Sequence, residues 1–384
     1  MKNIIALVDC DSFFVACEQV LAPELLGKPV CVLSNNNGCV VSRSKEAKTV
    51  GVKMGMPFFM AKKEFPNVTY ITGNLDRYGE FSKKVMNKLK EYSPNVEVYS
   101  IDEAFIDLTG TERLYQKSYE DIIRMIKDDI YNELKIPVSI GLAPSKTLAK
   151  LASDKAKSTG GIFVVKPEEI YSILSKTSLD EIWGIGKNMN LKLKKKGIFT
   201  PIELIQKEDS LLKSYFGVVG LNLKHELLGE CISFVNPVEE APKSIQHTSA
   251  LKEFTNDKNI LKTGLNTHIH SACKKLRKHG LLCKKVGTML RTKDFEVISL
   301  VKNLDESTNF ELEIQKTVFE LFEQIYLENV LYRSTGVYLF DFEPEFCKQL
   351  TLLKDEKEDK KNALTKCIDN IENKFGKNSI RTGY

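Results

Sequence analysis

The sequence predicts an α+β chain of several domains, with a ferredoxin-like domain near the N-terminus. Three observations support this prediction. The chain has 384 residues, which is more than one ordinary domain holds. Its first 170 residues alternate short apolar runs with stretches of helical periodicity. Two of the apolar runs deliver carboxylates, at Asp9 and at Asp102-Glu103.

The elements of the first region follow from local patterns. The apolar run Ile4 to Val8 predicts a buried strand, and residues 13–20 predict a helix that ends near Pro23. The other expected elements are strands over 29–34, 39–42 and 137–141, helices over 44–50, 75–92, 119–134 and 145–157, and a hairpin that carries Asp102 and Glu103. This order is ferredoxin-like, with a small domain inserted between about residues 27 and 75.

The second half has a different pattern. Short helices are expected from 175 to 230, around a turn that contains Gly184, Gly186 and Lys187 and resembles a helix-hairpin-helix. Backbone N–H groups at such a turn bind a DNA phosphate without reading sequence. Residues 236–242 read as a linker, 243–343 as another α/β domain, and the charged run 354–361 as a solvated helix or a disordered segment.

Charge is distributed unevenly over the last domain. The formal net charge of the chain is only +5. Residues 243–293 hold twelve Lys or Arg and two acids, whereas residues 294–343 hold three and eleven. This asymmetry fits a face that binds a polyanion, and it equally fits two solvated helical faces of opposite sign.

Several classes of protein are disfavoured by composition. Nine scattered cysteines without a CxxC pair argue against a disulfide framework or a zinc ribbon. The N-terminal apolar run is only five residues long and ends at Asp9, unlike a signal peptide. No stretch approaches the twenty apolar residues of a membrane span. We therefore expect a cytoplasmic, reduced protein that has no membrane partner.

The two acidic clusters suggest chemistry on phosphate. Carboxylates at the ends of neighbouring strands bind hard cations such as Mg²⁺. Two such ions can clamp the attacking and leaving oxygens of a phosphoryl transfer. The structural alternative is that each acid only stabilises a turn. Two aromatic residues, Phe13 and Phe14, follow Asp9 and Asp11 closely, and a simple turn has little need of them.

With these segments in place, the chain resembles the Y-family DNA polymerases, and among them the UmuC-like branch. Long motifs in the same order carry the resemblance, which spans nearly the whole chain; they cover residues 8–14, 33–44, 100–104 and 141–150. It implies a right-hand polymerase fold, with a palm (1–26 and 76–170), fingers (27–75), a helix-hairpin-helix thumb (171–236), a little finger (243–343) and a tail (345–384).

The resemblance also implies the role of individual residues. Asp9, Asp102 and Glu103 match the metal-binding carboxylates, with the backbone carbonyl of Cys10 as a further ligand of two Mg²⁺ or Mn²⁺ ions. Phe14 matches a steric gate against ribonucleotides, and Phe13 lies beside it. The positions expected to hold the triphosphate are Ser42, Lys45, Lys48 and Lys157. Many relatives have Tyr at the gate, and Tyr and Arg in place of the lysines at 45 and 48, so Lys45 is equally well read as a solvated helix residue.

The expected activity is template-directed addition of deoxynucleotides to a primer on damaged DNA, with low fidelity, in repair and SOS mutagenesis. The residues expected to contact DNA are Gly184, Gly186, Lys187, Lys274, Lys275, Arg277, Lys284, Lys285 and Arg291. In the tail, Gln349, Leu350, Leu352 and Leu353 resemble a sliding-clamp-binding peptide, although a strand that docks back onto the protein is the alternative. A UmuD-like accessory subunit is a further expected partner. The competing functions are a nucleotidyl cyclase and a non-catalytic, DNA- and clamp-binding relative.

Overall fold

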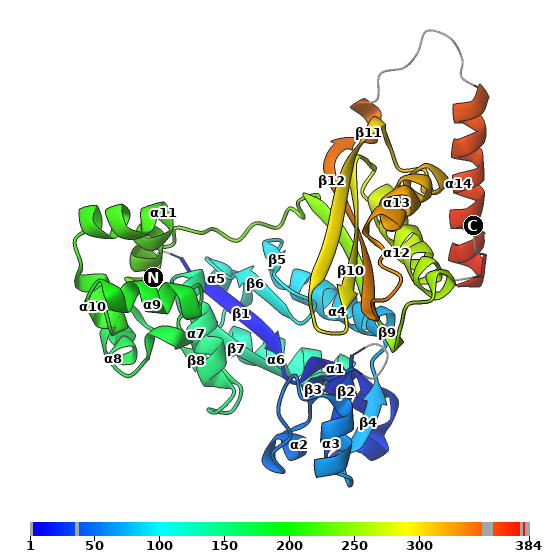
Figure 1. Ribbon diagram of the computed structural model, residues 1–384. Helices are drawn as coiled ribbons and strands as arrows, with labels where there is room; N and C mark the ends of the chain where they lie inside the picture. The colour runs from blue at the N-terminus through cyan, green and yellow to red at the C-terminus, as the bar shows by residue number, and fades with distance from the viewer. Residues whose placement is uncertain (1–2, 35–37, 348–355, 377–378, 381–384) are drawn as a thin grey trace. The chain divides into compact units, whose positions relative to one another are not determined.

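The computed structural model describes residues 3–34, 38–347, 356–376 and 379–380. The chain divides into two compact units, Met1–Glu239 and Glu240–Tyr384, and each is described by itself (Figure 1). Among the described residues, none of the helices combines the length and the apolar character that a membrane span requires.

The first unit is centred on a five-stranded sheet with strand β1 in the middle. The strand order is β5-β6-β1-β7-β8. Strand β1 pairs antiparallel with β6 and β7, and β7 pairs parallel with β8. The strands are β1 (Ile5–Cys10), β5 (Val96–Val98), β6 (Glu103–Asp107), β7 (Val138–Ala143) and β8 (Ile162–Val164).

Alternation along β1 divides the core into two layers. Ala6 and Val8 pack with α4 (Leu75–Lys90) and α6 (Tyr119–Leu134), whereas Ile5 and Leu7 pack with α7 (Lys146–Ala156). Asp9 continues the Ile5 and Leu7 series, so its side chain belongs to the face that α7 covers. Two further helices complete this region, α1 (Phe13–Leu21) and α5 (Thr111–Tyr115).

The inserted segment forms a small sheet of its own. Its strand order is β3-β2-β4, and β2 pairs parallel with β4. Its elements are β2 (Val30–Leu33), β3 (Val40–Arg43), α2 (Lys45–Thr49), α3 (Phe58–Glu64) and β4 (Thr69–Thr72). The sequence patterns indicated β2, β3 and α2 but neither α3 nor β4, because an exposed four-residue edge strand has no clear period.

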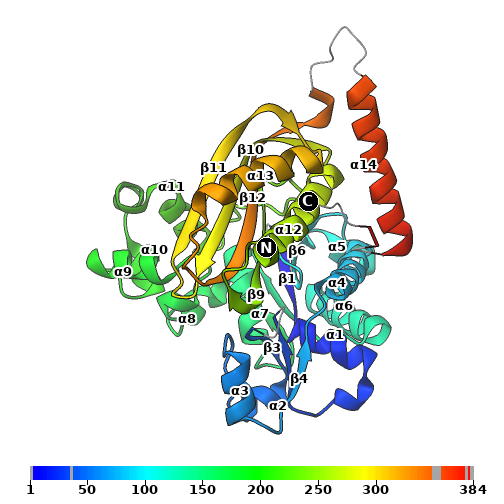
Figure 2. The same ribbon diagram turned by 45° about the vertical axis from the view of Figure 1, so that its right-hand side comes forward.

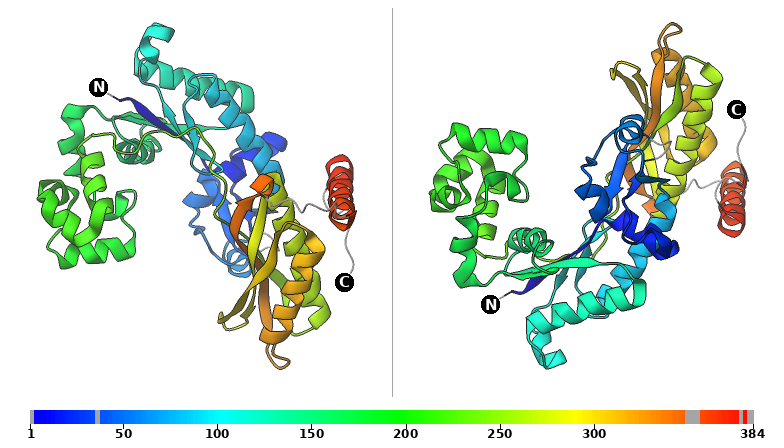
Figure 3. Two further views of the ribbon diagram at one scale, coloured as in Figure 1. Left: turned by 90° about the horizontal axis from the view of Figure 1, so that it is seen from above. Right: turned by 90° about the horizontal axis from the view of Figure 1, so that it is seen from below.

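A group of helices follows the sheet (Figure 3, green). They are α8 (Ile170–Leu174), α9 (Lys187–Lys195), α10 (Pro201–Gln206) and α11 (Asp209–Leu227), with α11 kinked at Gly217. The first helix expected for the helix-hairpin-helix around Gly184 is a short 3-10 turn, η4 (Leu179–Glu181). Gly184 has φ +92°, which lets the chain turn into α9 with Gly186 as its N-cap.

The second unit is a four-stranded antiparallel sheet with helices on one face (Figure 2). The strand order is β11-β10-β12-β9. Its elements are β9 (Ser244–Thr255), α12 (Lys258–Lys278), β10 (Leu281–Thr292), β11 (Val297–Thr308), α13 (Glu311–Ile325), β12 (Tyr332–Pro344), η5 (Glu345–Cys347) and α14 (Glu356–Phe375). Val286 and Leu290 of β10 are buried together with Leu265 of α12 and Val318 of α13.

The charged run 354–361, expected as a solvated helix or a disordered segment, is helical from Glu356 onward and begins α14. A later part of this helix packs against the α/β domain. Asp369 of α14 makes two hydrogen bonds with Arg277 of α12, at 2.8 and 2.6 Å. The sequence showed only dense charge here, which does not reveal that some of the acids have partners 90 residues away. The tail residues matched to a clamp-binding peptide, Gln349, Leu350, Leu352 and Leu353, lie outside the described residues.

Candidate active site

Two of the predicted carboxylates lie side by side because of strand register. Asp9 of β1 is the direct partner of Glu103 of β6, and both belong to the face that α7 covers. The N–H of Cys10 donates to the carbonyl of Asp102 at 2.9 Å, which fixes the turn before β6 next to the end of β1. The backbone therefore brings the end of β1 next to Asp102 and Glu103, which are far from Asp9 in the sequence.

Two lysines of α7 contact this pair. Lys157 Nζ lies 3.0 Å from Asp9 Oδ2, and Lys150 Nζ lies 2.6 Å from Glu103 Oε1. Burial and a hydrogen bond with Glu103 raise the pKa of Asp9 to about 7. Burial also opposes ionisation of Glu103, but hydrogen bonds with Asp9 and Lys150 outweigh it and lower the pKa of Glu103. The two carboxyl groups thus share one site, and a lysine lies beside each of them.

The third acid is held separately. Asp102 Oδ1 accepts a hydrogen bond from Ser100 Oγ at 2.6 Å. Within the described part of the chain, no three carboxylate, thiol or imidazole groups are already gathered as a metal cluster. The donor chemistry nevertheless fits Mg²⁺, since the groups are carboxylate oxygens and the Asp9–Glu103 contact needs a proton or a cation between its members.

A supported aromatic ring follows the first acid. Phe14 is half-buried and stacks on Tyr78 of α4, with ring centroids 4.7 Å apart and an interplanar angle of 18°. Tyr78 is fully buried, and its hydroxyl donates to Glu18 Oε1 at 2.7 Å. Phe13 is 3% exposed and belongs to the core. Of the two aromatics, Phe14 is therefore the one whose ring is both partly exposed and supported from behind.

The small inserted domain contacts the turn after β1 at one residue, Ser12. Ser42 Oγ donates to the Ser12 carbonyl at 3.3 Å, and Lys48 Nζ donates to Ser12 Oγ at 3.1 Å. Ser12 itself has φ +49° in the turn between β1 and α1. Lys45 is exposed in the first turn of α2, and the arrangement does not single it out. Ser42 and Lys48 thus contact the turn that follows Asp9, and Lys157 contacts Asp9 itself.

Comparisons with known proteins show the family to which the chain belongs. A model described as the impB/mucB/samB family matches residues 8–154, and its C-terminal domain matches residues 242–352. Protein UmuC of Salmonella typhimurium is 31% identical over 98% of this chain and 92% of its own. DNA polymerase IV 1 of Bacillus subtilis is 32% identical over all of this chain and 93% of its own. The chain belongs to the impB/mucB/samB family of Y-family DNA polymerases.

Solved structures agree with this assignment. A Y-family polymerase chimera of Dbh and Dpo4 matches 89% of this chain and 99% of its own, with 28% identity and a TM-score of 0.74. An insertion ternary complex of Dbh DNA polymerase matches the same shares with a TM-score of 0.59. The right-hand polymerase fold, with palm, fingers, thumb and little finger, is confirmed, and the protein is a DNA-directed DNA polymerase of the translesion type.

The residues expected to contact DNA lie in different settings. In the thumb, Gly184, Gly186 and Lys187 are exposed at the start of α9. In the little finger, Lys285 and Arg291 alternate with the buried Val286 and Leu290, which places them on the face of the sheet away from the helices.

The remaining expected DNA contacts lie elsewhere on the little finger. Lys274 and Arg277 of α12 are engaged by carboxylates of α14, so neither is a free cation. Lys284 pairs with Glu343 at 2.5 Å, and Lys275 is exposed on α12. The cations that the sequence suggested as one polyanion-binding face are thus divided between the sheet and α12.

Two site residues were missed by the reasoning from sequence. Lys150 lies seven residues before Lys157, which is two helical turns, so both reach the same face of the sheet. That spacing was a usable signal. Ser139 of β7 is the register partner of Asp9, and its hydroxyl donates to Asp11 Oδ1 at 2.8 Å. A serine inside an apolar strand gave no comparable signal, since most such hydroxyls only satisfy the backbone.

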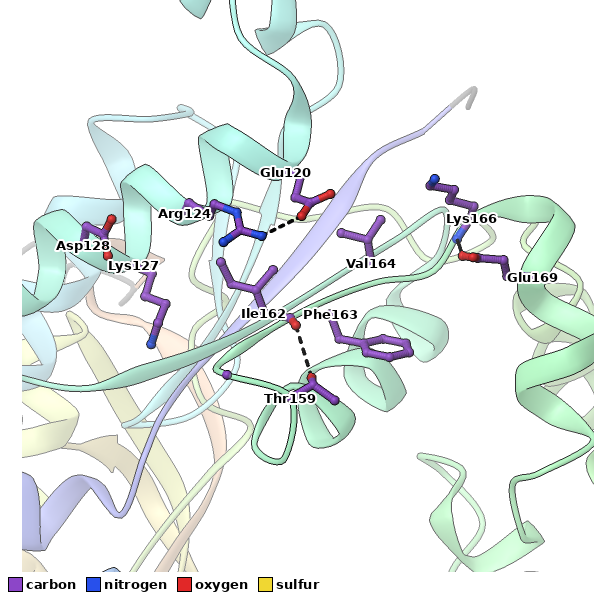
Figure 4. A pocket seen from close by; sticks show the side chains of 11 residues that line it. Glu120, Arg124, Lys127, Asp128, Thr159, Ile162, Phe163, Val164, Lys166 and Glu169 are labelled. Atoms are coloured by element: carbon purple, nitrogen blue, oxygen red, sulfur yellow. Dashed lines mark hydrogen bonds and ion pairs between the residues drawn. The ribbon is translucent and has the colours of Figure 1, made fainter.

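A cleft of about 430 Å³ lies elsewhere on the first unit, between α6 and the edge strand β8 (Figure 4). None of the described residues that line it is a predicted site residue. Two of the cations along the cleft already have partners: Arg124 pairs with Glu120 at 2.7 Å, and Lys127 donates to the carbonyl of Val138 at 3.0 Å. Acids and bases are mixed along its walls, so charge favours no one ligand.

Proposed function

We propose that Asp9, Asp102 and Glu103 are the catalytic carboxylates of this polymerase and, with the backbone carbonyl of Cys10, hold two Mg²⁺ ions, or Mn²⁺ in their place. The observation that carries the proposal is the Asp9–Glu103 pair, placed in direct register on adjacent strands with a lysine beside each acid. Two bound ions supply charge stabilisation between the primer hydroxyl and the α-phosphate.

The lysines prepare the site for a triphosphate. Lys157 is 41% exposed at its side chain, whereas Asp9 is 11% exposed. The acid is fixed by its strand, and the lysine has a long side chain that can leave it for a phosphate oxygen as a point charge. Ser42 and Lys48 add a hydroxyl and a second cation from the fingers. Lys45 is the weakest of the proposed contacts, because it is exposed on α2 and lies outside the Ser12 contacts.

Phe14 is proposed to select the sugar. Its ring is braced from behind by Tyr78, so it cannot retreat when a nucleotide binds. A 2′-hydroxyl would meet this ring, and ribonucleotides are rejected by shape. Phe13 supports the turn from the core. The chain lacks the hydroxyl that a tyrosine gate would offer, and the proposed selection rests on the ring alone.

Primer-template DNA is proposed to contact the exposed start of α9, through Gly184, Gly186 and Lys187, and the open face of the little-finger sheet, through Lys285 and Arg291. A free helix N-terminus and cations on an accessible sheet both bind phosphates without regard to sequence. Lys274 and Arg277 would join them only if α14 left α12. Small residues near the fingers, among them Gly38 and Gly55, support the expectation of low fidelity.

Partners beyond DNA and deoxynucleotides follow from the relatives. We propose that the tail peptide 349–353 binds a sliding clamp and that a UmuD-like subunit assists the enzyme in SOS mutagenesis. One relative of the chain is a UmuC protein, which supports the second of these. A cytoplasmic location fits enzymes whose substrates are DNA and deoxynucleotides.

Primer extension tests the proposed site. Asp102→Ala should abolish extension on a primed template with Mg²⁺ and four deoxynucleotides, while DNA binding persists. Asp107→Asn is the matched control, because Asp107 stands at the far end of β6, the strand that begins directly after Asp102. Its side chain accepts a hydrogen bond from the N–H of Thr109 at 2.9 Å. Asp102→Ala with wild-type extension would refute the metal-site assignment. An inactive wild type that still binds DNA would instead favour the need for an accessory subunit.

A further inference from the structure

A carboxylate far from the acids is buried where the thumb meets the palm. Glu226 lies in the last turn of α11 and is 3% exposed. A charge removed from water to this extent needs strong partners. Its Oε2 accepts a hydrogen bond from the N–H of Thr147 at 3.0 Å, and its Oε1 accepts from Ile232 and Ser233 at 2.8 and 2.9 Å. All three donors are backbone groups, so the contact fixes main chain rather than side chains.

The first of these donors belongs to α7. Thr147 is in the first turn of that helix, where N–H groups have no partner within the helix. A negative charge there is also favoured by the helix dipole. The backbone of Glu226 contributes as well, because its carbonyl accepts from Ser145 Oγ at 2.6 Å, and Ser145 is the N-cap of α7. Side chain and main chain of Glu226 thus hold the same helix end.

Close packing reinforces this junction three residues later. Gly229 has φ +86°, and a Cβ built there would lie 2.9 Å from Ile170 Cδ1 and 3.2 Å from Pro144 Cγ. Pro144 directly precedes the N-cap of α7. A side chain at 229 would strain the backbone and displace Ile170 and Pro144, so the chain that leaves the thumb passes close to the segment that leads into α7.

The same helix carries the two lysines that contact the acids, with Lys150 about one turn after Thr147 and Lys157 at the C-cap. The helix has 11 residues and is about 16 Å long. Lys150 contacts Glu103, and Lys157 at its C-cap contacts Asp9. A helix of this length moves as a rigid rod, so a shift of its first turn reaches both lysines. A misplacement of about 1 Å near a reacting centre can cost roughly 100-fold in rate.

We infer that Glu226 is a positioning residue of the polymerase, which anchors the first turn of α7 to the thumb and so sets Lys150 and Lys157 against the acids. The inference rests on the active site proposed above. Glu226 touches no reacting group itself. Its effect passes through the helix, and the position of the thumb is thereby linked to the catalytic centre.

The test substitutes Glu226→Gln and measures single-nucleotide insertion before the steady state. A glutamine offers one acceptor oxygen, so it can satisfy Thr147 or the Ile232 and Ser233 pair but not both. Glu230→Gln is the control, because Glu230 is 58% exposed at its side chain and contacts His225. We expect the insertion rate constant of the Glu226 variant to fall roughly 10- to 100-fold with the burst amplitude retained, and the control to match wild type.

A purely structural role gives a different result. It would reduce the burst amplitude, which counts correctly folded enzyme, and leave the rate constant unchanged, and this outcome overturns the inference. Ser145→Ala leaves the carboxylate of Glu226 in place and is the second variant if Glu226→Gln does not fold; it removes the contact to the Glu226 carbonyl together with the long N-cap hydrogen bond that Ser145 Oγ accepts from the N–H of Leu148 at 3.4 Å. It should show the same fall in rate constant, to a smaller extent, and a wild-type rate constant overturns the inference.

A double-mutant cycle with Lys157→Ala completes the test. If Glu226 acts through the lysines, the two substitutions together cost less than the product of their separate effects. Multiplicative effects overturn the inference and leave the active site as proposed. Wild-type rates for both Lys157→Ala and Asp102→Ala would instead refute the active-site proposal itself, and the two failures are thus distinguishable.

Discussion

Replacing Phe14 by alanine should relax sugar selection without disabling the enzyme. The Phe14 ring is the half-buried outer member of a stack whose inner member, Tyr78, is fully buried. Removing the outer ring opens space where a 2′-hydroxyl would lie and moves none of the carboxylates. A pocket discriminates between ligands that differ by one small group by about 1–3 kcal/mol, or 10- to 200-fold. We expect the preference for deoxynucleotides over ribonucleotides to fall by a factor in that range.

The same change should cost a modest part of the stability. An aromatic pair is worth about 0.5–1.5 kcal/mol beyond burial. A Phe→Ala change at a fully buried site costs about 3–5 kcal/mol, and Phe14 is only half-buried. We expect a loss of about 1–3 kcal/mol, against the 5–15 kcal/mol that stabilises a typical fold. The variant should therefore be folded at 25 °C, and a urea titration would check this.

The assay compares kcat/KM for one deoxynucleotide and its ribonucleotide on the same primed template. Phe13→Leu is the control, because Phe13 belongs to the palm core and is 3% exposed. It should lower stability and leave the sugar ratio unchanged. An unchanged ratio in Phe14→Ala, with activity intact, would refute the gate assignment. If only Phe13→Leu changed the sugar ratio, the gate would be Phe13 and the assignment to Phe14 would be wrong.

Two further predictions concern groups outside the acids. Tyr78→Phe keeps the ring but removes the hydrogen-bond donor to Glu18, which is 7% exposed. The urea midpoint of unfolding should fall by the equivalent of about 1–3 kcal/mol, and the sugar ratio should stay that of the wild type. An unchanged midpoint would contradict this. The second is a pH effect on α14. Hydrogen bonding to Glu311 raises the pKa of His270, whose other ring nitrogen lies 3.0 Å from Glu372. The stability that protonated His270 contributes to the packing of α14 is then complete below its unfolded pKa of about 6.5. This stability is lost as pH rises through the higher pKa of the folded state. Amide protection factors of α14 should therefore decrease with rising pH relative to those of β10, and a constant ratio would disprove the role of this histidine.

The sequence predicted the acid pair because two simple rules act together there. A run of five apolar residues ending in an acid predicts a buried central strand with a carboxylate at its end, and β1 has this form. The hairpin before β6 places the second pair of acids at the same edge. The long helices were predicted equally well, and the helix expected over 119–134 is α6 (Tyr119–Leu134). Such elements carry enough periodic positions to overcome local ambiguity.

The buried charges and ion pairs that the sequence did not predict depend on contacts between distant segments. Glu226 looks like any other charged residue of a helix end, and only the fold reveals the three N–H groups around it. Likewise, nothing in the sequence distinguishes Asp369 and Glu372 from the other acids of the tail, yet they bind cations of α12. Propensity reports on neighbours within a few residues, so it cannot distinguish a charge that faces water from one that faces a partner far along the chain.

The distribution of rigidity in the site has a functional consequence. The acids Asp9 and Glu103 are short side chains on paired strands, and their spacing is set by the backbone alone. The cations that neutralise them reach in on long side chains from α7. In the proposed mechanism the strands hold the two acids in place, while Lys157 exchanges Asp9 for a phosphate oxygen without any movement of the main chain. We therefore expect the palm to bind its substrates with little rearrangement, and the anchoring of α7 by the thumb to be what keeps the lysines within reach.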